Sequence, residues 1–334
     1  MVIKQKGKSN PVPTLFINGE EIAEVSSIKY LGDIFNALGN NDDLVADRIK
    51  RGTAAMVSIT GFMRETTLGP HTLSVYLLLH NAIFLPSMLF NAEAWSNITD
   101  KHIKELTTIQ LRFLKKIMSV RPAVSNAFVF LELGVLPIEY EIHKRQLSFI
   151  HHIMNLSEDD PVKKVWRNQV GLPDHRNWWT DVKKLLERYS LQFSEEDITK
   201  MSKETFKIKV KKAVNDYAFE RLKEECKNKS KTQNIMYDKF ATQEYIKTMN
   251  PDCARIIFKC RSKTLNIREH TKYQNVHETC RWCGVTDETL EHVTNCGNEE
   301  VVTNVEVLLN QISDLSVVEK VAERIKDFIT RVDL

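Results

Sequence analysis

The spacing of apolar residues changes character near residue 36 of the chain. Before that point, short apolar runs flank Asn18-Gly19, the dipeptide most typical of a two-residue β-hairpin turn, and a further strand signal covers Ile28–Gly32. After it, apolar residues recur every three to four positions, which is the spacing of one face of an α-helix. The pattern predicts a mainly α protein with a short N-terminal β-hairpin and strands.

Capping residues and prolines indicate where the first helices begin. The residues that can begin a helix are Asn41, Pro70, Thr99 and Pro137. The first of these helices has Gly52 on its apolar face, where another backbone can approach closely. Its opposite side is expected to present Arg48, Lys50 and Arg51. Residues 40–156 are therefore expected to form a bundle of four or five helices.

The most apolar stretch, residues 73–90, raises the question of a membrane span. It contains His80, Asn81 and Pro86, and a spanning helix would have to bury these polar groups in lipid at considerable cost. A buried core helix, kinked at Pro86 and running to about Trp95, is the expected structure. No partnership with a membrane is therefore expected.

Beyond the bundle, residues 157–200 contain turn signals and are expected to be a linker with short helices, followed by a basic helical region, 201–275. A long helix from about Lys203 to Glu225 dominates that region. Its outer face is rich in lysine, and its inner stripe is expected to be Phe206, Val210, Ala213 and Tyr217. Residues 202–231 hold ten Lys and Arg against five Asp and Glu, a local net charge of +5.

The composition limits where a function can reside. The 47 Lys and Arg and 44 Asp and Glu give a net charge of only +3, so binding to an acidic polymer has to rest on local basic surfaces. All six cysteines lie in the last third of the chain, and the basic first ten residues lack the apolar core of a secretory signal. A reducing, intracellular compartment is therefore expected.

The chemically specific motif of the chain is Cys280-x2-Cys283-x8-His292-x3-Cys296. Zn2+ prefers four sulfur or nitrogen ligands at tetrahedral positions, and a Cys-x2-Cys turn presents two thiolates together. Asp287 can cap a short helix that places the histidine and the last cysteine one turn apart. The motif predicts a structural zinc knuckle without an open position for a catalytic water.

Two alternatives stay open for this motif. His277 or Cys260 can replace one of the four ligands. The four residues can also be unrelated buried side chains, because a free cysteine often packs as a small hydrophobe.

A basic segment precedes the zinc motif. Residues 255–272 hold six basic residues and one acid, Glu269. The basic residues are Arg255, Lys259, Arg261, Lys263, Arg268 and Lys272. A basic segment beside a small zinc module fits a phosphate-contacting surface, and the alternative is a solvated, lysine-rich face.

Motifs of enzyme active sites are missing from the sequence. It has no Gly-rich phosphate loop and no Gly-x-Ser-x-Gly turn. Its Asp-Asp pairs, at 42–43 and 159–160, lie at a helix start and before a proline. A two-metal polymerase would hold its carboxylates at a hairpin tip between apolar strands. No catalytic residue is therefore predicted.

The order of these segments resembles the C-terminal part of non-LTR (LINE-type) retrotransposon reverse transcriptases. The similar stretches are IKYLG (28–32), LLHNAIFLPSMLFNAEAW (78–95), IQLRFLKKIM (109–118), LELGVLPIEYEIHKRQ (131–146) and CRWCGVTDETLEHVTNC (280–296). IKYLG looks like the last palm strand of that family. The last stretch looks like its zinc knuckle, with a basic stretch, FKCRSKTL (258–265), before it.

The resemblance implies a role for each segment. Residues 1–35 would be the end of the polymerase palm, and 36–156 the thumb that holds a primer–template duplex. Residues 180–296 would be the linker and zinc module that grip template RNA or target DNA, with the zinc knuckle itself at 276–300. The residues expected to contact phosphates are Arg48, Lys50, Arg51, Arg255, Lys259, Arg261, Lys263 and Arg268. The family's use of chromosomal targets implies a nuclear location.

The chain also departs from that family. The catalytic aspartates of the family lie upstream of its IKYLG-like strand and have no counterpart here. After Cys296 there are 38 residues, enough for helices at 300–311 and 315–331 in a segment of C-terminal helices, 301–334, but not for a nuclease. We therefore expect a C-terminal fragment, a decayed copy or a partial gene product that does not polymerise DNA on its own.

Three functions are compatible with this sequence. The first is binding of RNA, DNA or an RNA–DNA duplex by the accessory region of a reverse transcriptase. The second is a subunit that completes a split reverse transcriptase when an upstream polymerase region is supplied separately. The third is a host-retained, zinc-containing module that binds another protein.

Overall fold

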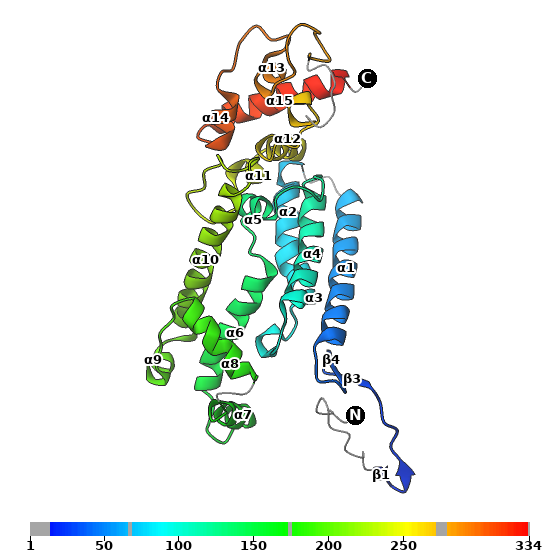
Figure 1. Cartoon of the computed structure of the whole chain (residues 1–334), viewed down its shortest axis with the longest axis vertical. Helices are drawn as coiled ribbons and strands as arrows, with labels where there is room; N and C mark the ends of the chain where they lie inside the picture. The colour runs from blue at the N-terminus through cyan, green and yellow to red at the C-terminus, as the bar shows by residue number, and fades with distance from the viewer. Residues whose placement is uncertain (1–13, 66–68, 173–175, 272–278, 333–334) are drawn as a thin grey trace. The chain divides into compact units, whose positions relative to one another are not determined.

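The computed structural model describes residues 14–65, 69–172, 176–271 and 279–332 (Figure 1). The protein is mainly helical with short N-terminal hairpins, as predicted. It divides into two compact units that interleave along the chain. Unit 1 contains residues 1–57, 82–110 and 138–214, and unit 2 contains residues 58–81, 111–137 and 215–334. The division of the sequence into functional segments stays a prediction, because compactness does not test it.

The elements follow one another in a simple order. The strands are β1 (Phe16–Ile17), β2 (Glu20–Glu21), β3 (Ser27–Tyr30) and β4 (Asp33–Asn36). The first helices are α1 (Asp42–Glu65), α2 (Thr72–Leu79), α3 (Leu85–Met88), α4 (Asp100–Ile117), α5 (Asn126–Leu133) and α6 (Ile138–Met154). They are followed by α7 (Pro161–Val170), α8 (Trp178–Arg188), α9 (Glu195–Lys200), α10 (Lys203–Lys227) and α11 (Glu244–Thr248). The last helices are α12 (Pro251–Arg261), α13 (Leu290–Asn295), α14 (Val305–Asn310) and α15 (Leu315–Val332).

The two N-terminal hairpins have two-residue turns with positive φ angles. Asn18 (φ 52°) and Gly19 (φ 85°) join β1 to β2, which confirms the predicted hairpin. Leu31 (φ 47°) and Gly32 (φ 94°) join β3 to β4 in the same way. The strand predicted over residues 28–32 is therefore wrong at its end, because the chain turns after Tyr30 and pairs with a fourth strand.

The apolar stretch before residue 90 forms the predicted buried helix. Leu73, Phe84 and Met88 are fully buried. The helix ends at Met88 rather than near Trp95, and a π-helical segment, His80–Phe84, interrupts it just before Pro86. Proline has no N–H for the helical ladder, which explains the irregular turn there. Within the described ranges, the protein has no helix whose length and apolar character suit a membrane crossing.

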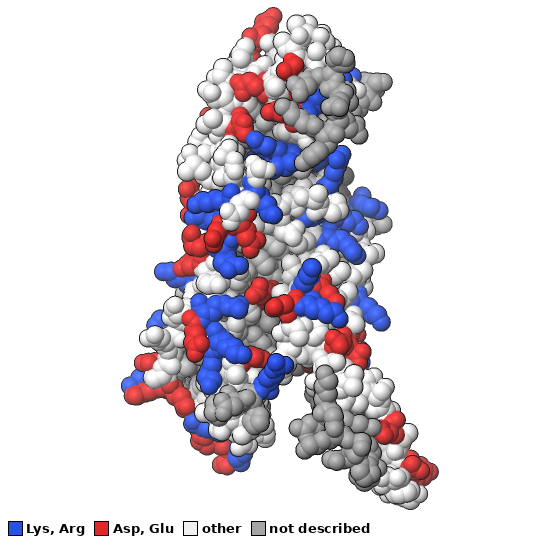
Figure 2. Space-filling view, viewed as in Figure 1, with Lys and Arg blue, Asp and Glu red and all other residues white. Residues whose placement is uncertain are grey.

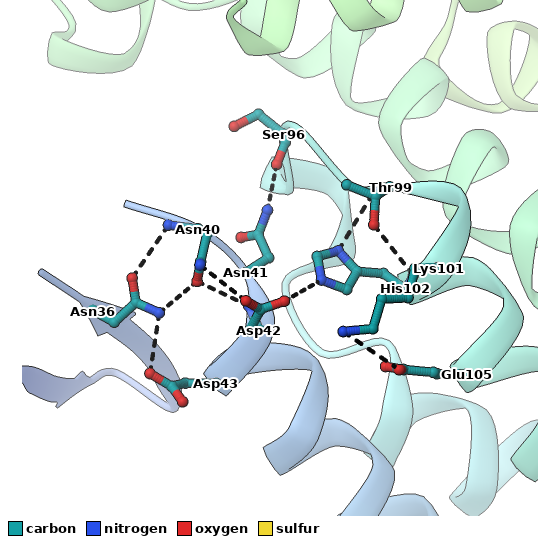
Figure 3. A network of polar contacts seen from close by, with 10 residues as sticks. All are labelled: Asn36, Asn40, Asn41, Asp42, Asp43, Ser96, Thr99, Lys101, His102 and Glu105. Carbon is teal, nitrogen blue, oxygen red and sulfur yellow. Dashed lines mark hydrogen bonds and ion pairs between the residues drawn. The ribbon is translucent and has the colours of Figure 1, made fainter. Parts of the chain in front are cut away.

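A polar network fixes the start of α4 against the start of α1 in unit 1 (Figure 3). Thr99 caps α4 as predicted, because its hydroxyl accepts the His102 amide (3.3 Å) while His102 Nδ1 accepts the Thr99 amide (3.3 Å). The proton is therefore on Nε2, which donates to Asp42 Oδ1 (2.8 Å). This hydrogen bond lowers the pKa of Asp42. Asn41 occupies the predicted position directly before α1, where its backbone carbonyl accepts the Val45 amide (2.9 Å), and its side-chain amide donates to the Ser96 carbonyl (2.7 Å).

Short helices cover α6 in unit 1 (Figure 1). The segment predicted as a linker with short helices forms α7, α8 and α9, all of which pack on α6. The indole of Trp178 donates to the Glu93 carbonyl (2.8 Å), and its ring meets Phe149 edge-on. Trp178 is therefore a packing residue of this unit.

The long helix α10 confirms the predicted helix but corrects its inner stripe. The buried residues recur at every fourth position: Phe206, Val210, Val214, Ala218, Leu222 and Cys226. Ala213 and Tyr217 are only half-buried. The prediction alternated spacings of four and three residues, whereas the helix keeps a spacing of four along its whole length. Its lysine-rich face is exposed as expected, with Lys203, Lys207 and Lys211 all open to solvent.

A buried carboxylate holds several elements of unit 2 together. Glu132 of α5 is completely buried and pairs with Arg261 of α12, Nη2 to Oε1 at 2.8 Å. The Tyr237 hydroxyl donates to the same carboxylate (2.7 Å), and so does the Tyr245 hydroxyl. Arg261 also donates to the Leu309 carbonyl. One charged pair with its hydrogen bonds thus connects α5, α11, α12 and α14.

Gly134 ends α5 with a left-handed backbone conformation, and the space beside its Cα is too small for a Cβ. Its φ is +60°, and a Cβ there would lie 2.1 Å from the Thr242 nitrogen. We expect Gly134→Ala to destabilise the protein by about 2–4 kcal/mol, from left-handed backbone strain and overpacking. Gly61→Ala is the matched control, because a Cβ at this helical position meets nothing within 4 Å among the described residues. That substitution should stabilise by about 0.5–1 kcal/mol in urea denaturation. Equal effects of the two changes would contradict the close approach at Gly134.

Candidate metal centre

The metal motif folds into a tight turn followed by one short helix, all in unit 2. Thr279 and Asp287 pair in an antiparallel bridge, and the Cys280 amide donates to the Thr286 carbonyl (2.6 Å). Helix α13 then begins after Thr289, whose hydroxyl accepts the His292 amide (3.1 Å). The prediction that Asp287 caps this helix is wrong, because Asp287 is held in the bridge two residues earlier.

The four predicted ligands converge at one point. One ligand atom from each of Cys280, Cys283, His292 and Cys296 lies within 4.8 Å of all the others. Cys280 Sγ lies 3.9 Å from Cys296 Sγ, and Cys283 Sγ lies 3.4 Å from His292 Nε2. The cluster can therefore hold a metal ion. Cys260 is not part of it and lies buried in α12, whereas His277 lies outside the described residues.

The cysteine ligands differ in their exposure to solvent and in the pKa of their thiols. Cys280 and Cys296 are buried, and Cys283 is exposed. Hydrogen bonding from the Val285 backbone, with a further contribution from Thr286, lowers the pKa of Cys283 to about 6. Burial raises the pKa of Cys296 to about 12. The thiolate form that binds a metal is thus favoured at the solvent side of the cluster.

A second ring of contacts orients the ligands. Thr286 Oγ1 lies 2.9 Å from His292 Nδ1 and 3.4 Å from Nε2, the ring nitrogen that also lies 3.4 Å from Cys283 Sγ. Such partners of a histidine fix its ring orientation and tautomer in metal sites. The sequence carries no signal for Thr286, because no spacing rule marks such a residue.

Glu288 stabilises the turn from the inside. It is 1% exposed and accepts hydrogen bonds from the Arg281 amide (2.9 Å), the Arg281 guanidinium and the Arg268 amide (3.1 Å). Burial opposes ionisation of this carboxyl, but the hydrogen bonds from Arg281 prevail and lower its pKa. A buried charge needs such partners, so Arg281 and Arg268 serve the local fold.

The knuckle also packs on the C-terminal helix. The ring of Trp282 lies 6.0 Å from that of Phe328, and the Arg331 guanidinium lies 4.4 Å from the Trp282 ring centre. Helices α14 and α15 fall within the two ranges expected for the C-terminal segment, apart from one residue at the end of α15. The metal motif therefore belongs to a larger packed region of unit 2.

Arg48, predicted to contact phosphates, is instead an internal residue of unit 1. It is fully buried and ion-paired with Asp33. Its guanidinium also donates to the Gly32 carbonyl (3.1 Å) and lies 5.3 Å from the centre of the Phe90 ring. The prediction is wrong because Arg48 lies on the inner face of α1, where it ties the β3–β4 hairpin to the helix. Gly52 lies on the same face, but it admits the side chain of Met88 rather than another backbone.

Lys50 and Arg51 are exposed, as predicted for the outer side of α1. Arg51 is paired with Asp47 (2.6 Å). Their contact with phosphates stays a prediction.

The predicted basic segment 255–272 splits into internal and accessible residues. Arg261 is 3% exposed and neutralised by Glu132, so its prediction as a phosphate contact is wrong. Lys263 is paired with Glu306 (2.6 Å), and Arg268 donates to the Thr279 carbonyl. Arg255 and Lys259 remain half-exposed on one side of α12, and Lys272 lies outside the described residues.

Comparisons with known proteins leave the chain without an assigned family. No protein-family model matches it, and no curated protein and no solved structure matches it significantly.

Proposed function

We propose that this chain is the nucleic-acid-binding, C-terminal part of a reverse transcriptase of the non-LTR type, without a polymerase active site of its own. The observation that carries the proposal is the convergence of four side chains: Cys280, Cys283, His292 and Cys296. Among the stretches that resemble the family, the segment 280–296 that holds them has a specific motif. In this role the helical segment 36–156 and helix α12 of the basic helical region 201–275 grip RNA, DNA or an RNA–DNA duplex. The proposed location of the protein is the nucleus, where chromosomal targets are found.

The metal proposed for the cluster is a structural Zn2+. Three thiolates and one imidazole are a donor set that Zn2+ uses in closed, four-coordinate sites. Because the protein supplies four ligands, the ion would stabilise the fold of the knuckle rather than activate a water. The predicted consequence is that metal binding and folding of residues 279–296 are one event.

Local charge supports the nucleic-acid part of the proposal. With Arg48 and Arg261 excluded as internal residues, Lys and Arg remain exposed on α1 and α4 and half-exposed on α12. The net charge of the whole chain is only +3, so these local surfaces would have to supply the attraction to phosphates.

A second candidate function rests on the N-terminal hairpins. Six large apolar side chains in or next to the hairpins are 55% to 78% exposed: Leu15, Phe16, Ile17, Tyr30, Leu31 and Leu38. Soluble proteins rarely leave a large apolar patch uncovered, and such patches mark protein interfaces. This surface favours a partner such as a separately supplied polymerase palm. The test is DNA synthesis on a primed RNA template by that palm, with and without this chain; an unchanged rate would contradict the second candidate.

The first candidate is tested by equilibrium binding of the metal-loaded chain to three labelled probes. The probes are an RNA–DNA hybrid duplex, a DNA duplex and a single-stranded RNA, all at low salt. We expect the hybrid duplex to bind at least as tightly as the others, because the thumb-like segment is proposed to hold primer–template. A chain that keeps its metal and its helices but binds none of the probes would contradict the proposal and favour a protein-binding module.

A further inference from the structure

Five basic side chains of unit 2 lie on three helices. They are Arg64 of α1, Arg112 and Lys116 of α4, and Arg255 and Lys259 of α12. The first three are exposed and the last two are half-exposed. In Figure 2, Lys and Arg side chains gather over α12 and the adjoining ends of α1 and α4. We call these five residues the three-helix basic cluster.

Contacts between the helices bring the members together. Arg255 Nε donates to the carbonyl of Ile117, next in the chain to Lys116 (3.0 Å). Lys116 Nζ lies 3.4 Å from the hydroxyl of Thr60, one turn before Arg64 on α1. Arg112 lies one turn before Lys116 on the same face of α4. The cluster therefore spans three helices that are held in fixed register.

Tyr76, on α2, senses the charges of this cluster. Burial raises the pKa of Tyr76, and the positive charges of Arg255 and Arg64 act against that shift. Two arginines from different helices thus act on one buried phenol. Arg64 and Arg255 therefore both lie within electrostatic reach of Tyr76.

Acidic residues do not neutralise the cluster. Among the residues that the structure describes, Asp252 forms an ion pair with Arg255 (3.4 Å), and the other four members have no acidic partner. The side chains therefore carry a net charge of +4, five cations less Asp252. The carboxyl ends of three helices contribute roughly −0.5 each, about −1.5 in all. A clear positive surplus remains.

Mutual repulsion within the cluster is visible at Lys259. Burial lowers the pKa of Lys259, and the neighbouring charge of Arg255 lowers it further. A bound anion would relieve this repulsion. An anion with several charges would relieve it at several members at once.

We propose that the three-helix basic cluster binds successive phosphate groups of a nucleic-acid backbone. The inference rests on the proposed function and identifies the surface that performs it. A polyanion fits better than a single phosphate, because the cationic groups come from three helices and most are open to solvent. The lysines of α10 are a weaker candidate: Lys207, Lys209, Lys211 and Lys212 come from one helix and point in different directions around it.

The test compares two triple variants with the same loss of charge. The cluster variant is Arg64→Gln, Arg112→Gln and Lys116→Gln, and the matched control is Lys203→Gln, Lys207→Gln and Lys211→Gln on α10. Each triple variant removes three exposed positive charges. Among the described residues, none of these six side chains has an acidic partner. Binding to a labelled DNA duplex is measured across a salt series, and far-ultraviolet circular dichroism checks that both variants keep their helices.

We expect the cluster variant to bind at least about tenfold more weakly, with a salt slope shallower by about 3, one for each lost phosphate contact. The α10 control should keep both the affinity and the slope of the unmodified chain within about twofold. A loss confined to the α10 control would overturn the cluster and leave the proposed function intact. Failure of the unmodified chain to bind at all would instead overturn the proposed function, and the cluster with it.

Discussion

Cys280→Ser is expected to abolish stoichiometric metal binding and to unfold residues 279–296. Three protein ligands would remain of the four that converge in the structure. Structural zinc supplies about 10–16 kcal/mol of apparent binding free energy to small modules at neutral pH, so little holds the knuckle together without it. The helices of unit 1 should remain, since none of them contributes a ligand. Metal content and limited proteolysis within 279–296 measure the two effects.

Cys253→Ser provides the matched control for that substitution. Cys253 is also buried, at 5% exposure, but it lies on α12 outside the ligand cluster. The control should keep one metal ion per chain and resist proteolysis in the knuckle. If Cys280→Ser also kept its metal, the assignment of the ligands would be wrong. If it melted all helices together, the knuckle would not be a separate folding unit.

Glu132→Gln is expected to have the next largest effect, about 3–5 kcal/mol of lost stability. The substitution removes the negative charge opposite Arg261 and leaves that guanidinium buried without compensation. Urea denaturation of the metal-loaded chain, followed by circular dichroism, measures the loss. Because the carboxylate also accepts bonds from Tyr237 and Tyr245, the variant should lose cooperativity between α5 and the α11–α12 region.

The control for the buried pair is an exposed one. Glu139 and Arg188 pair at 3.1 Å, with 34% and 43% of their side chains exposed. Glu139→Gln should cost no more than about 1 kcal/mol, since solvent screens such pairs. A second check combines Glu132→Leu with Arg261→Met, which should recover stability relative to either change alone. Similar losses for Glu132→Gln and Glu139→Gln would contradict the central place of Glu132 in unit 2.

Local signals were sufficient for much of the fold and for the metal centre. Asn18-Gly19 determines its hairpin because both residues accept a positive φ angle. Thr99 determines the start of α4 because its hydroxyl accepts the amide of His102, three residues further along the chain. The four metal ligands lie within one short segment, so a spacing rule finds them. In each case the interacting groups are close in the sequence.

The helical spacing of Arg48 predicts its buried position in α1, whereas its charge predicts exposure. It lies four residues before Gly52 and eight before Met56, both on the buried face of α1. Its charge suggested an exposed position, whereas its helical spacing placed it inside. A buried arginine is compatible with that face because Asp33 neutralises it.

Long-range pairs could not be predicted from spacing. Glu132 and Arg261 are 129 residues apart, and no periodic pattern connects them. The same holds for the three-helix basic cluster, whose members belong to α1, α4 and α12. Only the packed structure brings Lys116 near Thr60, and Arg255 near the end of α4.

The most direct measurement is the affinity of the purified, metal-loaded chain for a labelled RNA–DNA duplex across a salt series. If the chain binds primer–template through the three-helix basic cluster, log Kd should change steeply with log salt. The expected change is about 0.7–0.9 for each neutralised phosphate. Four or five such contacts would give a slope of about 3–4.5. Absence of binding at low salt, with the metal bound and the helices intact, would contradict a nucleic-acid-binding function.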